Sequence, residues 1–411
     1  MRILLVNKFH YIVGGSETYY FALKRLLEEK GHTVIEFSMK DDRNLPSDYE
    51  KYFVDNIDYN NNMSLGKKID AAASIIYSRD AKKKFEKIVL DTKPDIIHLH
   101  LFQHQISPSI LDVIKKYNIP TVYTAHELKM ICPNYKMLNH GKVCEECKDG
   151  QYWHCFKNRC VKESLSKSMV NTIESYVHRW RKSYDVIQKI ITPSMFYRDK
   201  FIEFGVDADR VVHIPNFLDR EYPIVNERDD RNKYILYFGR LSEEMGIMTL
   251  IKAASITGYP TYIVGGGILR QKIEGLISSE NADNIKMLGF KSGQELIDLV
   301  GNAKAVVLPS EWYENGPYSA IEALQLRRPV IGADIGGIPE LVDSNGFLYE
   351  SCNIEELVQA MKKLYSLSER EYSELEENSG RLFEIYYTAE RHYDKLMMVY
   401  KDIIREGKNN I

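Results

Sequence analysis

The chain has 411 residues, more than one ordinary hydrophobic core organises, so its length favours two domains. Hydrophobic residues make up 44% of the sequence and charged residues 27%, as in ordinary globular proteins. The formal net charge of −3 argues against general binding to nucleic acid. No apolar run is long enough to span a membrane, and the first residues lack the pattern of a signal peptide. We therefore expect a cytoplasmic protein.

Short apolar runs alternate with helical patterns along the chain, which is typical of doubly wound α/β domains. We expect residues 1–215 to form an N-terminal, acceptor-side Rossmann-like domain. Its predicted strands are Arg2–Asn7, Asp95–Leu101, Thr121–His126, Lys189–Thr192 and Val211–Pro215. The pair Gly14-Gly15 follows the first strand, and Ser16 is the expected N-cap of the next helix.

The segment 216–232 is polar and charge-rich, so we interpret it as a linker. The alternating pattern then restarts and predicts a second Rossmann-like domain over 233–388. Its predicted strands are Tyr234–Phe238, Pro260–Val264, Ile285–Phe290, Ala303–Leu308, Pro329–Gly332 and Gly346–Tyr349. Residues 389–411 are predicted to contain a long helix that crosses back to the first domain.

The strongest functional signal lies between Leu308 and Ala323. Gly316-Pro317 marks a turn, and a helix that begins near Pro317 would direct free amides at an anion. Glu322 lies about one and a half turns into that helix, from where it could reach a ribose. Glu314 lies on the loop and could face a sugar ring. The alternative is a solvated helix with two surface glutamates.

Glu314 and Glu322 also match the E-x7-E motif of the family 4 retaining glycosyltransferases, which have the GT-B fold. Further resemblances to that family occur in order along nearly the whole chain: Gly14-Gly15, Pro215–Asp219, Gly239–Gly246 and Arg328–Glu340. The resemblance implies two Rossmann-like doubly wound domains that face each other across a cleft. It also implies a sugar nucleotide bound in that cleft.

The resemblance assigns a role to each matching residue. Arg240 would bind the diphosphate of the donor, Glu322 the ribose hydroxyls, and Glu314 the hydroxyls of the transferred sugar. The leaving diphosphate would also be bound by the backbone of two segments: Gly14-Gly15 and Gly316-Pro317-Tyr318-Ser319. Because the protein supplies these donors, the resemblance implies that catalysis needs no divalent metal ion.

One position departs from the family. Met245 stands where the family has a lysine that binds the diphosphate. The loss of one charge-assisted hydrogen bond costs roughly 1.5–3 kcal/mol, or on the order of ten- to a hundredfold in affinity or rate. Lys8 or Arg270 could compensate, the enzyme could be slow, or the residue could have been substituted. The departure also keeps open a non-catalytic, donor-binding role.

His126 ends a predicted strand at the edge of the cleft. An isolated histidine is more often structural than functional. His126, however, matches the histidine that lies beside the donor sugar in the family. We therefore assign it a sugar-positioning or weakly acid–base role.

Four cysteines form the pattern C-x2-C-x7-C-x4-C within an insertion at about 132–161: Cys144, Cys147, Cys155 and Cys160. This spacing favours a structural zinc ion, and the insertion has few aliphatic residues for a core of its own. Free thiols and disulfides are the alternatives. His140, His154 and Cys132 are alternative ligands.

Apolar residues form one helical stripe between 162 and 182: Leu165, Met169, Ile173, Tyr176 and Trp180. Basic residues flank the stripe: Lys162, Lys167, Arg179, Arg181 and Lys182. The first interpretation is an amphipathic helix with this stripe toward the core. The alternative is contact with a membrane surface that presents a lipid-linked acceptor.

Taken together, the residues and the resemblance predict a retaining glycosyltransferase that uses a UDP- or GDP-sugar. Its acceptor would be a glycan or a lipid-linked molecule in surface polysaccharide synthesis, with no nucleic acid involved. We expect the protein in the cytoplasm, with peripheral contact at the inner face of the membrane as an option. The alternatives are a non-catalytic donor-binding or scaffold subunit of a glycosyltransferase pair and a same-fold sugar-nucleotide epimerase.

Overall fold

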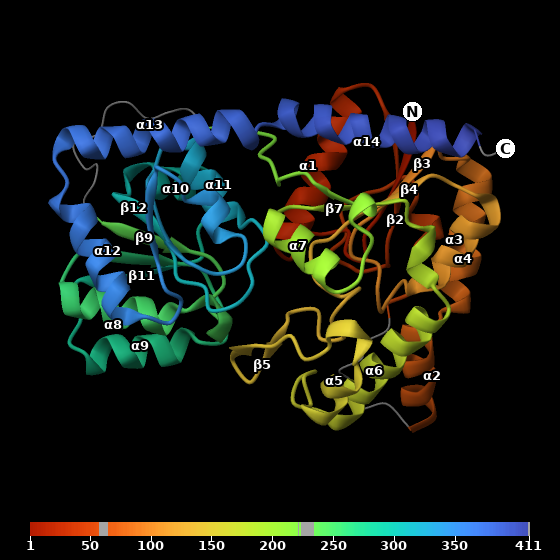
Figure 1. Cartoon of the computed structure of the whole chain (residues 1–411), viewed down its shortest axis with the longest axis horizontal. Coiled ribbons are helices and arrows are strands. Elements are labelled where there is room, and N and C mark those ends of the chain that lie inside the picture. The colour runs from red at the N-terminus through yellow and green to blue at the C-terminus, as the bar shows by residue number, and fades with distance from the viewer. Residues whose placement is uncertain (57–64, 221, 223–233, 410–411) are drawn as a thin grey trace.

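The computed structural model describes residues 1–56, 65–220, 222 and 234–409. It contains two domains, each built on a six-stranded, entirely parallel sheet (Figure 1). The strand order in the first sheet is β2-β1-β3-β4-β7-β8. Its strands are β1 (Arg2–Val6), β2 (Thr33–Phe37), β3 (Ile96–Leu99), β4 (Thr121–Thr124), β7 (Lys189–Thr192) and β8 (Val211–His213). The predicted α/β class is confirmed, although β2 was not predicted.

Helices pack on both faces of the first sheet: α1 (Gly15–Glu29), α3 (Arg79–Thr92), α4 (Leu111–Tyr117) and α7 (Met195–Glu203). Three further helices lie at one end of the domain (Figure 1): α2 (Leu65–Ile76), α5 (Trp153–Lys157) and α6 (Leu165–Trp180). Helix α1 begins one residue before Ser16, so the predicted N-cap is wrong. The N-cap is Gly14, which has extended backbone, and its amide donates to the carboxylate of Glu17 at 3.1 Å.

The second sheet has the strand order β11-β10-β9-β12-β13-β14. Its strands are β9 (Ile235–Phe238), β10 (Thr261–Val264), β11 (Ile285–Gly289), β12 (Ala305–Leu308), β13 (Val330–Ala333) and β14 (Gly346–Tyr349). The helices of this domain are α8 (Ile247–Thr257), α9 (Arg270–Ser279), α10 (Gly293–Asn302), α11 (Tyr318–Gln325), α12 (Ile354–Ser366) and α13 (Glu369–Tyr386). The central strands are apolar and buried, as strands covered on both faces require.

The last helix, α14 (Ala389–Asn409), leaves the second domain and packs on the first (Figure 1). Its Tyr400 hydroxyl lies 2.6 Å from Nδ1 of His98, and its His392 Nε2 lies 3.0 Å from the hydroxyl of Tyr19. Most of the predicted linker 216–232 lies outside the described residues. The described part begins with three buried residues, 216–218.

The insertion at 132–161 carries a short antiparallel hairpin, β5 (Leu138–Asn139) and β6 (Lys142–Val143), followed by α5. It lies at the end of the first domain that is lowest in Figure 1, together with α6. In the part of the chain that the structure describes, no helix has the length and apolar character needed to cross a bilayer.

Candidate active site

Two helix N-termini meet where the domains contact each other. Gly316 has φ +71°, a conformation that suits glycine, and Pro317 caps α11, which begins at Tyr318. The glycine that opens α1 lies against Tyr318, since a Cβ built on Gly15 would be 3.4 Å from the tyrosine ring. The amides and positive dipole ends of both helices therefore lie close together and can stabilise an anion.

Glu314 precedes this turn, and its carboxylate is held in place. Its Oε1 accepts hydrogen bonds from the Ser310 hydroxyl at 3.1 Å and from Nε1 of Trp312 at 2.9 Å. Burial raises the pKa of Glu314, and the two donors oppose that rise. The result is an oriented acceptor for the hydroxyls of a ligand.

Glu322 lies one turn beyond Tyr318 on α11, so the two side chains share the face of the helix that is turned to α1. Glu322 is partly buried, and burial raises its pKa to about 7. The ionised form of such a carboxylate is stabilised when hydroxyl donors bind to it, because their hydrogen bonds offset the cost of desolvation.

A chain of charges joins the domains beside this loop. The exposed Arg240 guanidinium lies 3.3 Å from Oε1 of Glu244, and Nζ of Lys136 lies 2.8 Å from the same oxygen. Lys136 belongs to the insertion of the first domain, and its Nζ lies 5.7 Å from the centre of the Trp312 ring. Because Trp312 also donates to Glu314, the five residues form one cluster.

His126 follows β4 on the first-domain side. Its Nε2 lies 3.1 Å from Nδ1 of His100, and the two rings stack with centroids 5.3 Å apart. Burial lowers the pKa of His126 to about 3, so the ring is neutral at physiological pH. This favours the sugar-positioning role over the acid–base role.

Asn315, which sequence reasoning did not single out, ties the loop of Glu314 to the strand of His126. Its Nδ2 donates to the carbonyl of Ala125 at 2.8 Å, and its Oδ1 accepts from the Ser194 hydroxyl at 3.0 Å. Asn216 adds a second link, since its Nδ2 donates to the carbonyl of Gly316 at 2.9 Å. These amides fix the position of the second-domain loop against the first domain.

Family models match both domains. The model of Glycosyltransferase Family 4 matches residues 13–222, which is more than half of the chain. The model described as Glycosyl transferases group 1 matches residues 219–381. The chain belongs to glycosyltransferase family 4. The predicted family is thereby confirmed, and the protein is a glycosyltransferase.

Individual relatives agree with the family. This glycosyltransferase is 25% identical over 359 residues to an uncharacterized 42.6 kDa protein in the cps region of Klebsiella pneumoniae, covering 83% of this chain and 87% of that protein. It is 22% identical over 413 residues to O-antigen chain mannosyltransferase C of Escherichia coli, covering 98% and 99%. It also resembles the crystal structure of Anabaena Alr3699/HepE in complex with UDP, at 17% identity and TM-score 0.63, covering 98% and 100%. The structural likeness confirms the GT-B fold.

The position that departs from the family motif is turned to the interior. Met245 ends a short 3-10 helix, Glu243–Met245, and packs against the core of the second domain. Of the two residues that could compensate, Arg270 pairs with Glu274 on its own helix at 2.9 Å, and Lys8 lies over the ring of Phe9. The cation that joins the Arg240 cluster is Lys136 instead.

The structure does not support the predicted zinc site at Cys144, Cys147, Cys155 and Cys160. Within the described residues, no group of three or more His, Cys, Asp or Glu is arranged to hold a metal ion. Cys147 and Cys155 pack with Tyr152 in a small apolar cluster, and Cys160 packs against it. The Cys160 thiol also lies 3.7 Å from Oδ1 of Asn139. The four cysteines form no disulfide bond, and the zinc ion stays a prediction. Burial raises the pKa of the Cys144 and Cys147 thiols.

Proposed function

We propose that this glycosyltransferase moves a hexose-type sugar, with retention of configuration, from a UDP- or GDP-sugar to a glycan or lipid-linked acceptor in surface polysaccharide synthesis. One observation carries the proposal: the fixed Glu314 carboxylate lies on the loop that leads into α11, and the N-terminus of α11 lies beside that of α1. The UDP bound to the Anabaena structure supports the donor class. The names of the Klebsiella and Escherichia relatives support the pathway.

The diphosphate of the donor needs positive partners. Arg240 offers a planar fork that matches phosphate oxygens, and the amides at Gly15 and Tyr318 add the dipole ends of two helices. Lys136 supplies the cation that the family carries at position 245. Glu244 holds Arg240 and Lys136 together before the donor binds, and the diphosphate then takes its place as their partner. These groups neutralise the leaving diphosphate without a divalent metal ion.

The transfer breaks the bond between the anomeric carbon and the phosphate oxygen. A bond from the same face to the acceptor oxygen forms, and the acceptor proton passes to the leaving phosphate. Glu314 holds hydroxyls of the transferred sugar, and the neutral His126 positions the sugar from the first domain. In this scheme neither residue acts as a nucleophile.

Incubation of the purified protein with a panel of UDP- and GDP-sugars tests the proposal. We expect slow donor hydrolysis by the protein alone, unaffected by EDTA. NMR of the released sugar, recorded before its anomers equilibrate, should show the anomeric configuration of the donor. An inverted product would contradict retention, and loss of activity with EDTA would contradict metal independence. Donor binding without any turnover would favour the non-catalytic subunit that Met245 suggested. A nucleotide sugar with altered stereochemistry would indicate an epimerase.

A further inference from the structure

The apolar stripe of helix α6 faces outward, although its sequence predicted that the stripe faces the core. The residues of its apolar stripe are between 39% and 85% exposed: Leu165, Met169, Ile173, Tyr176 and Trp180. Its polar residues are buried instead: Ser168, Asn171, Thr172, Glu174 and His178. The prediction that the stripe faces the core is therefore wrong. Two exposed residues of α5, Trp153 and Phe156, enlarge the apolar surface.

The physical reason for this orientation is a buried ion pair. Nζ of Lys129 lies 2.9 Å from Oε2 of Glu174, and both side chains are 2% exposed. Lys129 also donates to Oδ1 of Asn171 at 2.6 Å, and His178 Nε2 lies 3.0 Å from the carbonyl of Ile76. Rotation of α6 to bury its stripe would leave Lys129 buried without its counterion, which is costly. The apolar face is thus fixed outward.

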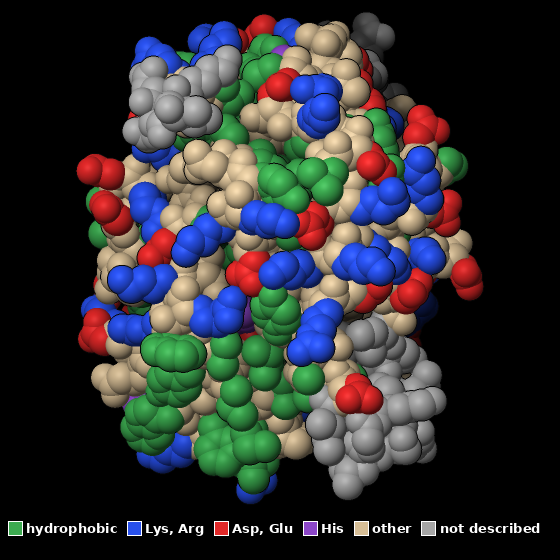
Figure 2. All heavy atoms as spheres, turned by 90° about the vertical axis from the view of Figure 1, so that its right-hand side faces the viewer, with side chains coloured by type: hydrophobic (Ala, Val, Ile, Leu, Met, Phe, Trp, Pro, Cys, Tyr) green, Lys and Arg blue, Asp and Glu red, His purple; other side chains and the backbone are tan. Residues whose placement is uncertain are grey.

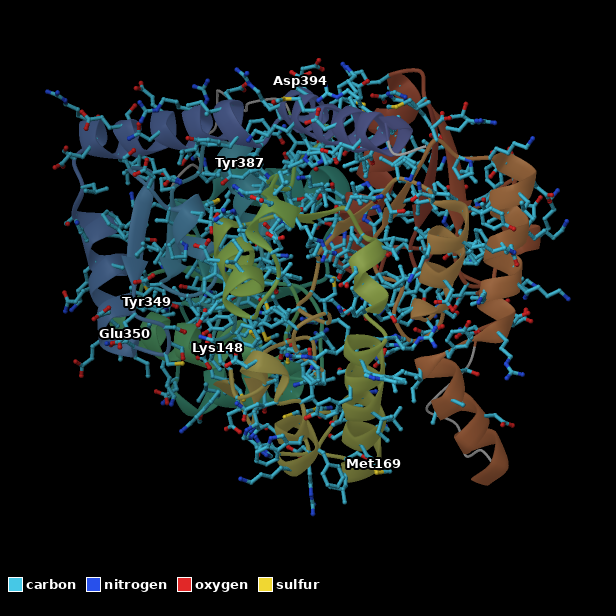
Figure 3. The ribbon with its side chains drawn as sticks, turned by 45° about the vertical axis from the view of Figure 1, so that its right-hand side comes forward. Lys148, Met169, Tyr349, Glu350, Tyr387 and Asp394 are labelled. Atoms are coloured by element: carbon cyan, nitrogen blue, oxygen red, sulfur yellow. The ribbon has the colours of Figure 1, made fainter. Side chains whose placement is uncertain are left out.

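Figure 2 shows hydrophobic side chains gathered at the lower end of one face of the molecule, next to lysine and arginine side chains. Figure 3 shows Met169 near the outer end of α6, away from the two sheets. We define the outer surface as Trp153 and Phe156 of α5 together with the exposed stripe of α6. An apolar surface of this kind on a globular domain indicates a contact with another molecule.

Charge narrows the choice of partner. Residues 153–182 contain seven Lys and Arg against two Asp and Glu, although the whole chain carries a net charge of −3. The basic residues are all exposed: Lys157, Arg159, Lys162, Lys167, Arg179, Arg181 and Lys182. One of the two acidic residues, Glu174, is already paired with Lys129. The outer surface therefore combines apolar and aromatic side chains with a basic border.

We propose that the outer surface docks on a bilayer that carries anionic lipid. Its tryptophans and aliphatic side chains would enter the boundary between headgroups and acyl chains, and its lysines and arginines would face the lipid phosphates. A symmetric contact with a second copy of the chain would place this basic border against itself, which disfavours self-association. The remainder of the acidic chain is repelled by the same lipid, so one orientation is selected.

The docked surface is connected to the candidate active site. Lys129 binds α6 and follows His126 by three residues, so α6 and the loop of His126 are held as one unit. If the proposed function is correct, this arrangement brings the acceptor side of the enzyme to a lipid-linked acceptor. Docking itself requires neither donor nor acceptor, so it can be tested separately from transfer.

Co-sedimentation with vesicles tests the proposal. The full chain should bind vesicles of phosphatidylcholine with about one third phosphatidylglycerol, and bind phosphatidylcholine alone much more weakly. The double variant Met169→Glu with Ile173→Glu should lose roughly tenfold or more of the binding, because a charge cannot enter the apolar boundary. The double variant Lys162→Glu with Lys167→Glu should lose binding to the anionic vesicles by a similar factor.

Ile256→Glu is the matched control, since Ile256 is 63% exposed on α8 of the second domain. It should bind vesicles as the wild type does. All changed positions are exposed, so each variant should have the melting temperature of the wild type. This measurement also shows that each variant is folded. No binding by the wild type, or equal binding by wild type and α6 variants, would overturn the proposal. A concentration-dependent dimer in light scattering that the α6 variants abolish would also overturn it.

Discussion

Nζ of Lys136 lies 2.8 Å from Oε1 of Glu244, although the two residues are 108 positions apart and belong to different domains. Glu244 also holds Arg240, the expected diphosphate ligand. The family motif has a lysine one residue further along, at the position of Met245. The contact therefore places a lysine of the opposite domain beside Arg240.

This relationship predicts the effect of three variants. Lys136→Met should reduce donor affinity or turnover roughly ten- to a hundredfold, as the loss of one charge-assisted contact would. Met245→Lys in the wild type should give little gain, because a cation is already in place. In the Lys136→Met background it should restore part of the loss. Isothermal titration with UDP- or GDP-sugars and initial rates are the measurements.

Lys142→Met is the control, since Lys142 is an exposed lysine on the same insertion. It should leave affinity and rate at the wild-type level. A large gain from Met245→Lys alone, with no effect of Lys136→Met, would show that the site lacks a cation and that Lys136 has only a structural role.

The raised pKa of Glu322 predicts that both stability and nucleotide affinity depend on pH. Because burial raises its pKa from 4.5 to about 7, the folded protein binds this proton more tightly than the unfolded chain. The free energy of unfolding should then fall as pH rises from 4.5 to 7, by at most about 1.4 kcal/mol per pH unit, and level off above 7. Nucleotide affinity should rise over the upper part of this range, because the ionised carboxylate accepts from the ribose hydroxyls.

Glu322→Gln should abolish both trends and bind nucleotide roughly tenfold more weakly above pH 7. Urea unfolding and isothermal titration between pH 5 and pH 8.5 measure the two effects. Glu355→Gln changes an exposed glutamate on α12 and should alter neither curve. If Glu322→Gln retained wild-type affinity at pH 8, its assignment to the ribose would be wrong.

Much of the fold could be predicted because its signals are local. The buried parallel strands are short apolar runs, and Gly316-Pro317 marks the start of α11. Strand β2 was missed because Glu36 interrupts its apolar run. That carboxylate is buried only because the Ser47 hydroxyl donates to it at 2.6 Å and Lys24 lies 3.6 Å away. Such partners are visible only in three dimensions.

The features that could not be predicted depend on distant partners. The period of α6 gives a stripe, but the side that faces the core is decided by Lys129, a residue of another segment. Lys136 lies in no motif, and its position beside Arg240 depends on its contact with Glu244 of the other domain. The spacing of the cysteines marks them as a group, but it does not predict how their thiols are arranged in space.

His126 should behave as a neutral residue. With a pKa lowered to about 3 by burial, it stays uncharged through the range in which the enzyme is assayed, so it contributes no limb to the kcat profile between pH 5 and pH 8. His126→Ala should reduce kcat roughly tenfold or more, and His126→Asn should keep more activity because an amide still offers a hydrogen bond. His140→Asn, at an exposed position of the insertion, should have no effect. A limb near pH 6.5 that disappears in His126→Asn would contradict this assignment and favour the acid–base role.

Substitution of Lys129 or Glu174, which form a buried pair, should be among the changes that most destabilise the first domain. Burial by itself raises the pKa of Glu174, but Lys129 and His104 outweigh it and hold the value at about 2. A lowered carboxyl pKa contributes stability that is fully present above 4.5 and is lost as pH falls from 4.5 toward 2. Lys129→Met should therefore cost about 3–5 kcal/mol at pH 7, because it leaves a buried carboxylate without its counterion.

The loss of stability caused by Lys129→Met should become smaller as pH falls, since the unpaired carboxyl can then be protonated. Adding Glu174→Gln to Lys129→Met should recover part of the lost stability at pH 7, and a double-mutant cycle gives the coupling. Urea unfolding at pH 4.5 and pH 7 is the measurement. Lys116→Met is the matched control, because Lys116 pairs with Glu86 at 2.7 Å on the surface and should hardly change the urea midpoint. Equal effects of the two lysine substitutions would show that the buried pair does not hold α6 in its orientation.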